Sequence, residues 1–140
     1  MAEQSFGIDF SGYWRELDKG SVPSKSGIYC VYRGVYNKDK NTVSLQQLIY
    51  IGESVDVRDR LANHEKLGEW SKYLKKGEEL CYSFGAIPAA HRVRCEAALI
   101  FRHKPPVNTE YVKAFPHDKT SISLTGKSKF LDASVTISRT

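Results

Sequence analysis

Two strand-like runs followed at once by a helix-like segment constrain the fold of this chain more than any other feature. Gly27–Tyr36 and Leu48–Ile51 are rich in β-branched and aromatic side chains, which predicts two strands. The polar segment NKDKN between them is typical of a turn. After Gly52, the segment SVDVRDRLANHEKL has helical apolar spacing, with Ser54 or Asp56 as its cap. The sequence therefore predicts a β-β-α unit with a long connection between its strands.

The rest of the chain is predicted to form short elements around one long helix. Ala89–His103 is rich in alanine and arginine and is followed by Pro105 and Pro106, which is typical of a helix and its end. The other expected elements are a lead-in helix at Ser11–Leu17, a helix at Glu69–Lys76, a strand at Leu80–Ile87 and two short strands within ISLTGKSKFLDASVTIS.

Length and composition favour a single compact domain. The chain has 140 residues, of which 41% are hydrophobic and 26% charged, and a net charge of +5 that permits an anionic partner. We expect one domain over 1–140, with a core at about 24–110 and a C-terminal extension at 111–140. No signal peptide or long apolar run is visible, so we expect a cytoplasmic protein without a membrane partner, in a bacterial or phage setting. The cysteines Cys30, Cys81 and Cys95 are widely spaced and are expected to be reduced thiols in the core.

Glu96 is the residue that points most directly to chemistry. It interrupts the apolar helical run CEAALIF, so its carboxylate is expected near the core or in a closed cleft. Burying an unpaired carboxylate is costly, and a bound cation is one remedy. Mg²⁺ or Mn²⁺, held by one carboxylate and several waters, would fit. The alternative is a buried salt bridge to Arg92 or to another helix.

Four other residues could act beside Glu96. Strand alternation can bring Tyr29 and Tyr50 to one face of the sheet, although buried tyrosines in hairpins usually serve packing. Arg60 and His64 are four residues apart on the predicted helix and would share one face. The planar guanidinium of arginine suits a phosphoryl group. The alternative for Arg60 and His64 is a solvated surface.

The segments Gly27-Ile28-Tyr29 and Tyr50-Ile51-Gly52 match the two tripeptides that name the GIY-YIG endonuclease family. Arg60 follows the second tripeptide by eight residues and His64 follows Arg60 by four. Glu96 lies in a later predicted helix, and Asn108 follows the proline pair. The chain resembles this family over about 26–109, and its long connection between the strands looks like that of the restriction-enzyme branch. A departure from many members is Glu53 directly after the second tripeptide, whose role stays open.

The resemblance implies an α+β fold, with a small three-stranded antiparallel sheet flanked by helices and short terminal embellishments. It also implies hydrolysis of DNA with a single metal ion, which Glu96 would hold. A water activated by Tyr29 or Tyr50, with His64 assisting proton transfer, would attack the phosphorus while Arg60 stabilises the added charge. Gly27, Gly52 and Asn108 would support the site structurally.

The predicted function is a metal-dependent endonuclease for duplex DNA at defined sites, active as a monomer or a homodimer. One alternative is a nuclease for single-stranded or branched DNA in repair or mobility. Another is a DNA-binding or protein-binding module that does not cleave. Basic residues outside the site that could contact DNA phosphates are Arg58, Lys75, Lys76, Arg92, Arg94 and Lys104.

Overall fold

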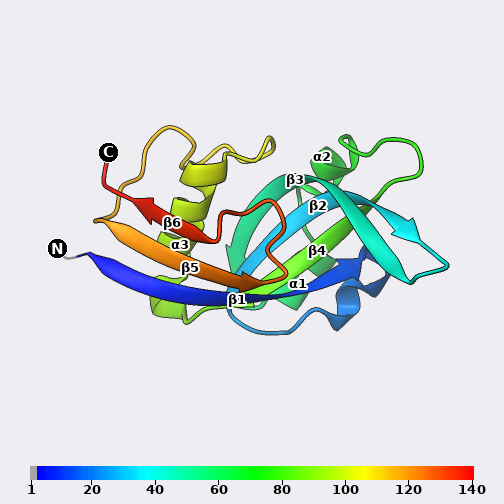
Figure 1. Ribbon diagram of the computed structural model, residues 1–140, viewed down its shortest axis with the longest axis horizontal. Coiled ribbons are helices and arrows are strands. Elements are labelled where there is room, and N and C mark those ends of the chain that lie inside the picture. Colours follow the sequence, from blue (N-terminus) through cyan, green and yellow to red (C-terminus); the bar gives the residue numbers. More distant parts are fainter. Residues whose placement is uncertain (1–2) are drawn as a thin grey trace.

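The computed structural model describes residues 3–140 as one curled six-stranded sheet with helices on both faces (Figure 1). The order of the strands is β3-β2-β4-β1-β5-β6. Neighbouring strands run antiparallel, except for β1 and β5, which run parallel. The strands are β1 (Gln4–Arg15), β2 (Gly27–Asn37), β3 (Thr42–Ser54), β4 (Glu79–Ala86), β5 (Thr120–Gly126) and β6 (Ser134–Ile137). The helices are η1 (Glu16–Ser21), α1 (Val57–Ala62), α2 (Leu67–Ser71) and α3 (Ala89–His103).

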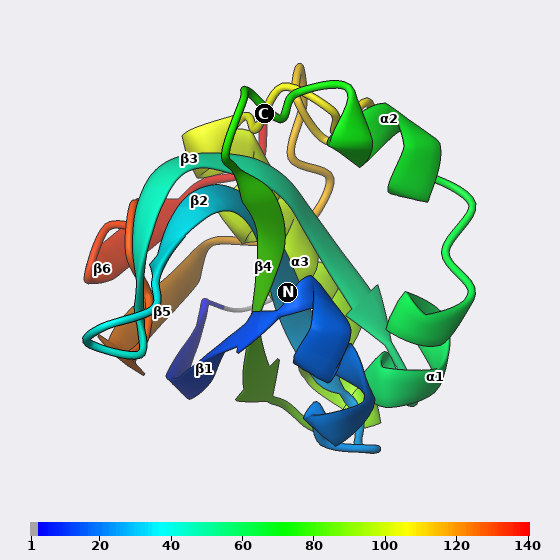
Figure 2. The same cartoon turned by 90° about the vertical axis from the view of Figure 1, so that its right-hand side faces the viewer.

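The predicted three-stranded sheet is wrong, and strand β1 is the reason. The predicted lead-in helix at Ser11–Leu17 lies mostly within β1. Ile8 and Phe10 are buried at alternating positions along that strand, as its pleat requires. Because β1 pairs with β4 on one side and with β5 on the other, it joins the two C-terminal strands to the main sheet. The result is a mixed, curled sheet, and Figure 2 shows the curvature of strands β2 and β3.

The predicted long connection between the first two strands is mostly strand. Only residues 38–41 separate β2 from β3, so the two strands form an extended hairpin. Strand β3 bulges, because Val31 pairs with Tyr50 whereas the next residue of β2 pairs with Leu48. The extra residue Ile49 lies between these two pairs. The bulge shifts the alternation of side chains, and Ile49 and Tyr50 both contact the same apolar cluster.

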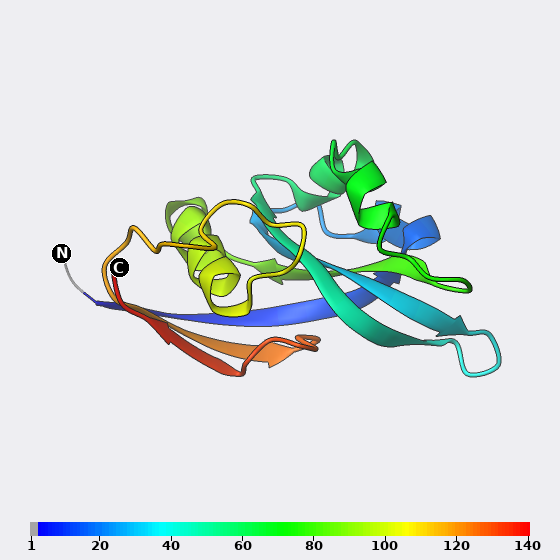
Figure 3. The same ribbon diagram turned by 90° about the horizontal axis from the view of Figure 1, so that it is seen from above.

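Two apolar clusters lie on opposite faces of the sheet. On one face, Ile28, Cys30 and Tyr32 of β2 pack with the buried residues of α3. On the other face, Tyr29 and Val31 pack with α1 and with Trp70 of α2. Figure 3 shows α3 toward the end of the molecule that holds the termini and α1 and α2 toward the other end. All three cysteines are buried and free, as predicted.

The helices show where local sequence signals suffice and where they fail. Helix α3 has the predicted bounds and ends at Lys104, whose φ of 46° is left-handed. The single helix predicted after Gly52 is wrong. Asp56 caps α1 by accepting a hydrogen bond from the Asp59 backbone N–H, but α1 stops at Asn63, which has φ −137° and ψ 57°. His64 therefore lies in the connection between α1 and α2 and does not share a helix face with Arg60.

None of the helices along residues 3–140 has both the length and the apolar character needed to cross a membrane.

Candidate active site

A cavity of about 350 Å³ brings together most of the predicted catalytic residues. Tyr29, Tyr50, Arg60 and Glu96 line it, and they come from β2, β3, α1 and α3. His64 is buried directly behind Tyr29. Six further residues line the cavity, and of these only Glu53 was named from the sequence. These are Glu53, Glu65, Lys66, Val93, Glu110 and Tyr111.

Gly52 makes room for the Tyr29 side chain. The two residues are partners in the β2–β3 ladder. A Cβ atom on Gly52 would lie 2.3 Å from both Cζ and Oη of Tyr29, closer than such atoms can approach. The glycine of the second tripeptide therefore lets the tyrosine of the first lie across strand β3 and reach the cavity.

The hydrogen bonds of His64 define its tautomer. The backbone N–H of Lys66 donates to Nδ1 at 3.1 Å, so the proton of the neutral ring is on Nε2. Nε2 lies 2.7 Å from the Tyr29 Oη and donates to it. Burial, and then the charge of Arg60, lowers the pKa of His64 to about 4, so the ring is neutral at ordinary pH. Its ring also lies 4.3 Å from that of Trp70, centroid to centroid.

Arg60 is held by a carboxylate that lines the same cavity. Its Nη1 and Nη2 donate to the two carboxylate oxygens of Glu65 at 2.5 and 2.6 Å. These hydrogen bonds lower the pKa of Glu65 to about 2. A phosphate would use the same edge of the guanidinium, because carboxylate and phosphate both accept from its two N–H groups in the same bidentate way. Glu65 therefore occupies the position at which Arg60 could bind an anionic substrate.

Glu96 lies in surroundings that disfavour its ionised form. Burial raises its pKa to about 8, and the charges of Glu53 and Glu110 add to the effect. Arg92 does not pair with Glu96 among the described residues; its Nε donates to Glu53, and its Nη1 donates to the Ser26 hydroxyl at 2.9 Å. Glu53, which lines the cavity, therefore has Arg92 as its ion-pair partner.

These acids suit a hard divalent ion. The described residues hold no group of three or more His, Cys, Asp or Glu side chains arranged to bind a metal by themselves. Magnesium sites, however, commonly use one or two carboxylates and several waters. A half-buried carboxylate with a pKa of about 8 ionises at neutral pH when a cation lies beside it. The donor set at Glu96 therefore fits Mg²⁺ or Mn²⁺.

Tyr50 is more open than Tyr29. Tyr29 is 1% exposed, whereas Tyr50 is half-buried. Burial, and then the charge of Glu96, raises the pKa of Tyr50 to about 12, while Arg60 lowers it. The Tyr50 ring lies 6.2 Å from that of Tyr29 and 5.7 Å from that of His64. The rings of both tyrosines thus contact the His64 ring, but of the two phenols only that of Tyr29 is hydrogen-bonded to His64.

Asn108 braces the outer edge of strand β3 next to Tyr50. Its Oδ1 accepts from the Ile51 backbone N–H at 2.9 Å, and its Nδ2 donates to the Ile51 carbonyl at 2.9 Å. The backbone N–H of Val107 also donates to the Ile49 carbonyl. The side chain of Asn108 thus completes the hydrogen bonding of a strand that has no neighbour on that side.

The arginines proposed as DNA contacts outside the site have internal partners. The Nε of Arg58 donates to the Val22 carbonyl at 2.7 Å. Arg94 donates to the Thr120 hydroxyl and to backbone carbonyls just before it. These arginines, together with Arg92, anchor segments that lie far apart in the chain. The lysines of the same group, which are Lys75, Lys76 and Lys104, are exposed.

The acids that complete the cavity carry weak sequence signals. Glu65 directly follows His64, but only the turn after α1 brings it back to Arg60. Glu110 follows Asn108 by two residues. Because Asn108 is hydrogen-bonded to strand β3, Glu110 also lies beside that strand and lines the cavity. The position of Glu110 close to Asn108 was therefore the sequence feature that could have identified Glu110 as a residue near the site.

In comparisons with known proteins, the chain matches no protein-family model, no curated protein and no solved structure.

Proposed function

We propose that this chain is a metal-dependent endonuclease that hydrolyses phosphodiester bonds in DNA. One observation carries the proposal: two tyrosines, a fork-shaped arginine and a carboxylate with a raised pKa line one cavity, although they come from four separate elements. The resemblance to the GIY-YIG family and the net charge of +5 support DNA as the substrate.

Tyr29 is the group we assign as the general base. Because His64 donates its Nε2 proton to the Tyr29 oxygen, the phenolic proton of Tyr29 must point away from the histidine. The same hydrogen bond stabilises a phenolate once that proton has left. Burial raises the pKa of Tyr29 and Arg60 lowers it, so the phenolate needs further positive charge in the cavity. In the reaction, Tyr29 first loses its phenolic proton to solvent in the cavity, and the resulting phenolate takes a proton from the attacking water.

Arg60 binds and stabilises the phosphate. As the water oxygen bonds to phosphorus and the bond to the leaving oxygen breaks, negative charge grows on the equatorial oxygens. Two guanidinium N–H groups can meet two of these oxygens at once. Arg60 must first exchange Glu65 for the substrate.

Glu96 is the residue we assign to hold the metal. When bound there, one Mg²⁺ or Mn²⁺ supplies Lewis-acid stabilisation of charge at the scissile phosphate. Glu96, on α3, would hold this ion in the cavity that the two tyrosines of the sheet also line. We assign duplex DNA as the preferred substrate.

The proposal is tested by incubating the protein with plasmid DNA and with a matched single-stranded circle, in EDTA, Mg²⁺ or Mn²⁺. A Glu96→Gln variant is compared with Glu69→Gln, which changes an exposed carboxylate of α2. We expect discrete duplex fragments that require both the metal and Glu96 but not Glu69. Products from the single-stranded circle alone would contradict the choice of duplex substrate. DNA binding without cleavage in any metal would contradict the enzyme assignment.

A further inference from the structure

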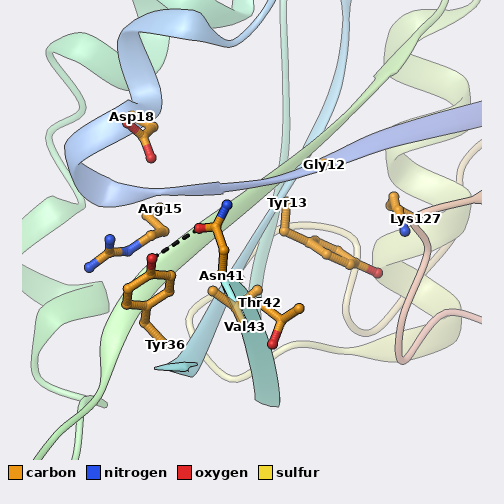
Figure 4. Close-up of a pocket in the computed structure, with 9 residues that line it drawn as sticks. All are labelled: Gly12, Tyr13, Arg15, Asp18, Tyr36, Asn41, Thr42, Val43 and Lys127. Carbon is orange, nitrogen blue, oxygen red and sulfur yellow. Dashed lines mark hydrogen bonds between the residues drawn. The ribbon is translucent and has the colours of Figure 1, made fainter. Parts of the chain in front are cut away.

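A second cavity, of about 450 Å³, lies at the hairpin end of the sheet (Figure 4). It shares no lining residue with the candidate active site. Its walls come from β1, from the start of η1, from the β2–β3 hairpin and from the residue after β5. The lining residues are Gly12, Tyr13, Arg15, Asp18, Tyr36, Asn41, Thr42, Val43 and Lys127.

The two cavities lie far apart on the same hairpin. Tyr36 follows Tyr29 by seven residues along β2, which corresponds to about 23 Å of strand. Tyr13 and Val43 pack against the apolar cluster on the α3 face, whereas Tyr29 belongs to the cluster on the opposite face. A substitution in the second cavity therefore leaves the candidate catalytic groups in place.

The aromatic wall of the second cavity is held by several side-chain contacts. The Arg15 guanidinium lies 3.6 Å from the centroid of the Tyr36 ring. Its Nε donates to both carboxylate oxygens of Glu79, at 2.9 and 3.0 Å, which fixes the guanidinium. The Tyr36 hydroxyl donates to the Asn41 Oδ1 at 2.9 Å (Figure 4). This last bond also leaves the Asn41 Nδ2 as a hydrogen-bond donor at the cavity wall.

The opposite end of the cavity carries a cation without a counter-charge. Among residues 3–140, no ion pair or side-chain hydrogen bond engages the Lys127 ammonium, although its backbone N–H is fixed by the Phe10 carbonyl at 2.8 Å. Figure 4 shows Lys127 across the cavity from Arg15, with Tyr13 between them. The wall thus offers aromatic surface, an amide donor and a separate cation.

We infer that this second cavity binds one nucleotide unit, with its phosphate at Lys127 and its base toward Tyr36 and Asn41. Bases stack on aromatic side chains regardless of sequence, and lysine binds phosphate as a point charge. A cavity of this size accommodates a small ligand of that kind. The unit is either part of a DNA strand or a free mononucleotide, and the choice of the strand rests on the proposed function.

The test uses the ¹⁵N-labelled full chain in EDTA, titrated with the oligonucleotide (dT)12 or with dTMP. Binding at the cavity is expected to shift the amide signals of Asn41 and Thr42. If (dT)12 shifts them and dTMP does not, the source is the strand. If dTMP shifts them equally, the source is a free nucleotide. If neither ligand shifts them, the inference fails.

A variant pair makes the same test quantitative. Each phosphate contact to a single strand contributes about 0.7 to the slope of log affinity against log salt. Lys127→Ala should lower that slope for fluorescein-labelled (dT)12 by about 0.7 and weaken binding about fivefold near 0.1 M salt. Lys72→Ala, an exposed lysine that lines neither cavity, should change neither value. Equal behaviour of the two variants would overturn the inference.

Failure here and failure of the proposed function are separable. Metal-dependent cleavage with unshifted Asn41 and Thr42 amides would leave the nuclease proposal standing and remove the second site. Shifted amides and a Lys127 effect without cleavage in any metal would retain the second site and remove the nuclease proposal.

Discussion

The Nε2 of His64 lies 2.7 Å from the phenolic oxygen of Tyr29, and both side chains are buried. The backbone N–H of Lys66 donates to Nδ1 of the histidine, so the proton between the two rings belongs to His64. The tyrosine oxygen is the acceptor in this pair. This direction matters, because it prepares Tyr29 to lose its own proton toward the cavity and to be stabilised afterwards.

Gly52→Ala should damage the site through steric contact alone. The new Cβ would lie 2.3 Å from the Tyr29 Oη, and the buried ring has little room to move. We expect a stability loss of about 1–3 kcal/mol, typical of overpacking, and at least about tenfold slower DNA cleavage. Gly68→Ala is the matched control, since nothing lies within 4 Å of its added Cβ. Urea denaturation and cleavage rates measure both effects, and normal cleavage by Gly52→Ala would be inconsistent with the close packing of Tyr29 over Gly52.

Glu65→Gln should release Arg60 for the substrate. The ion pair between them is exposed on the Glu65 side, so its loss costs little and should tighten DNA binding about two- to fivefold. The control is Asp132→Asn, which removes a comparable exposed pair with Arg102 at 2.8 Å. Affinity is measured by anisotropy in EDTA. Weaker binding by Glu65→Gln would show that Glu65 supports the substrate instead of competing with it.

The contribution of Glu96 to the stability of the metal-free protein should fall as pH rises from about 4.5 to about 8. In that window the folded chain keeps a proton on Glu96, whose pKa is about 8, whereas the unfolded chain has lost it near the ordinary value of 4.5. The unfolded state then binds fewer protons, so the free energy of unfolding decreases, by at most about 1.4 kcal/mol per pH unit.

His64 acts with the opposite sign, because its folded pKa of about 4 lies below its ordinary 6.5 and stability rises through that window. The difference between wild type and Glu96→Gln isolates Glu96. Urea denaturation at several pH values should show the stability of wild type declining relative to that of Glu96→Gln from about pH 4.5 to about pH 8, with Mg²⁺ restoring stability at pH 8 and EDTA removing the gain. A pH-independent difference between the two proteins would contradict the raised pKa.

Asn108→Ala should destabilise the edge of strand β3. It removes two hydrogen bonds and leaves the N–H and carbonyl of Ile51 without their side-chain partner. We expect a loss of about 2 kcal/mol in the free energy of unfolding. Asn63→Ala, at the exposed end of α1, serves as the control and should cost less. Equal losses in the two variants would mean that water replaces Asn108 at little cost.

The sequence predicted those elements whose signals are local. Helix α3 has the predicted bounds because its composition and the prolines after it act within one segment. Strand β1 was mistaken for a helix because SGYWREL has no strand pattern of its own. Its extended form depends on partners far along the chain, since Arg15 pairs with Cys81 and Gln4 pairs with Thr120. Distant pairing of this kind overrides local propensity.

The candidate site divides in the same way. Tyr29, Tyr50 and Arg60 could be selected because they match the tripeptides and spacing of the GIY-YIG resemblance, and Glu96 also because it interrupts an apolar helix; the structure places all four around one cavity. Glu65 could not, because its contact with Arg60 depends on how the chain turns after α1. Such a turn depends on tertiary contacts, which the spacing of apolar residues along the sequence does not predict.

The most direct test of the central claim is single-turnover cleavage of plasmid DNA in Mg²⁺ by Tyr29→Phe and Tyr32→Phe. Each change removes one buried hydroxyl from β2, but Tyr32 lies on the opposite face and donates to the Lys129 carbonyl. We predict that Tyr29→Phe cleaves at least about 100-fold more slowly, as expected for a lost general base, and that Tyr32→Phe cleaves like wild type. Cleavage by Tyr29→Phe at the wild-type rate would contradict the account.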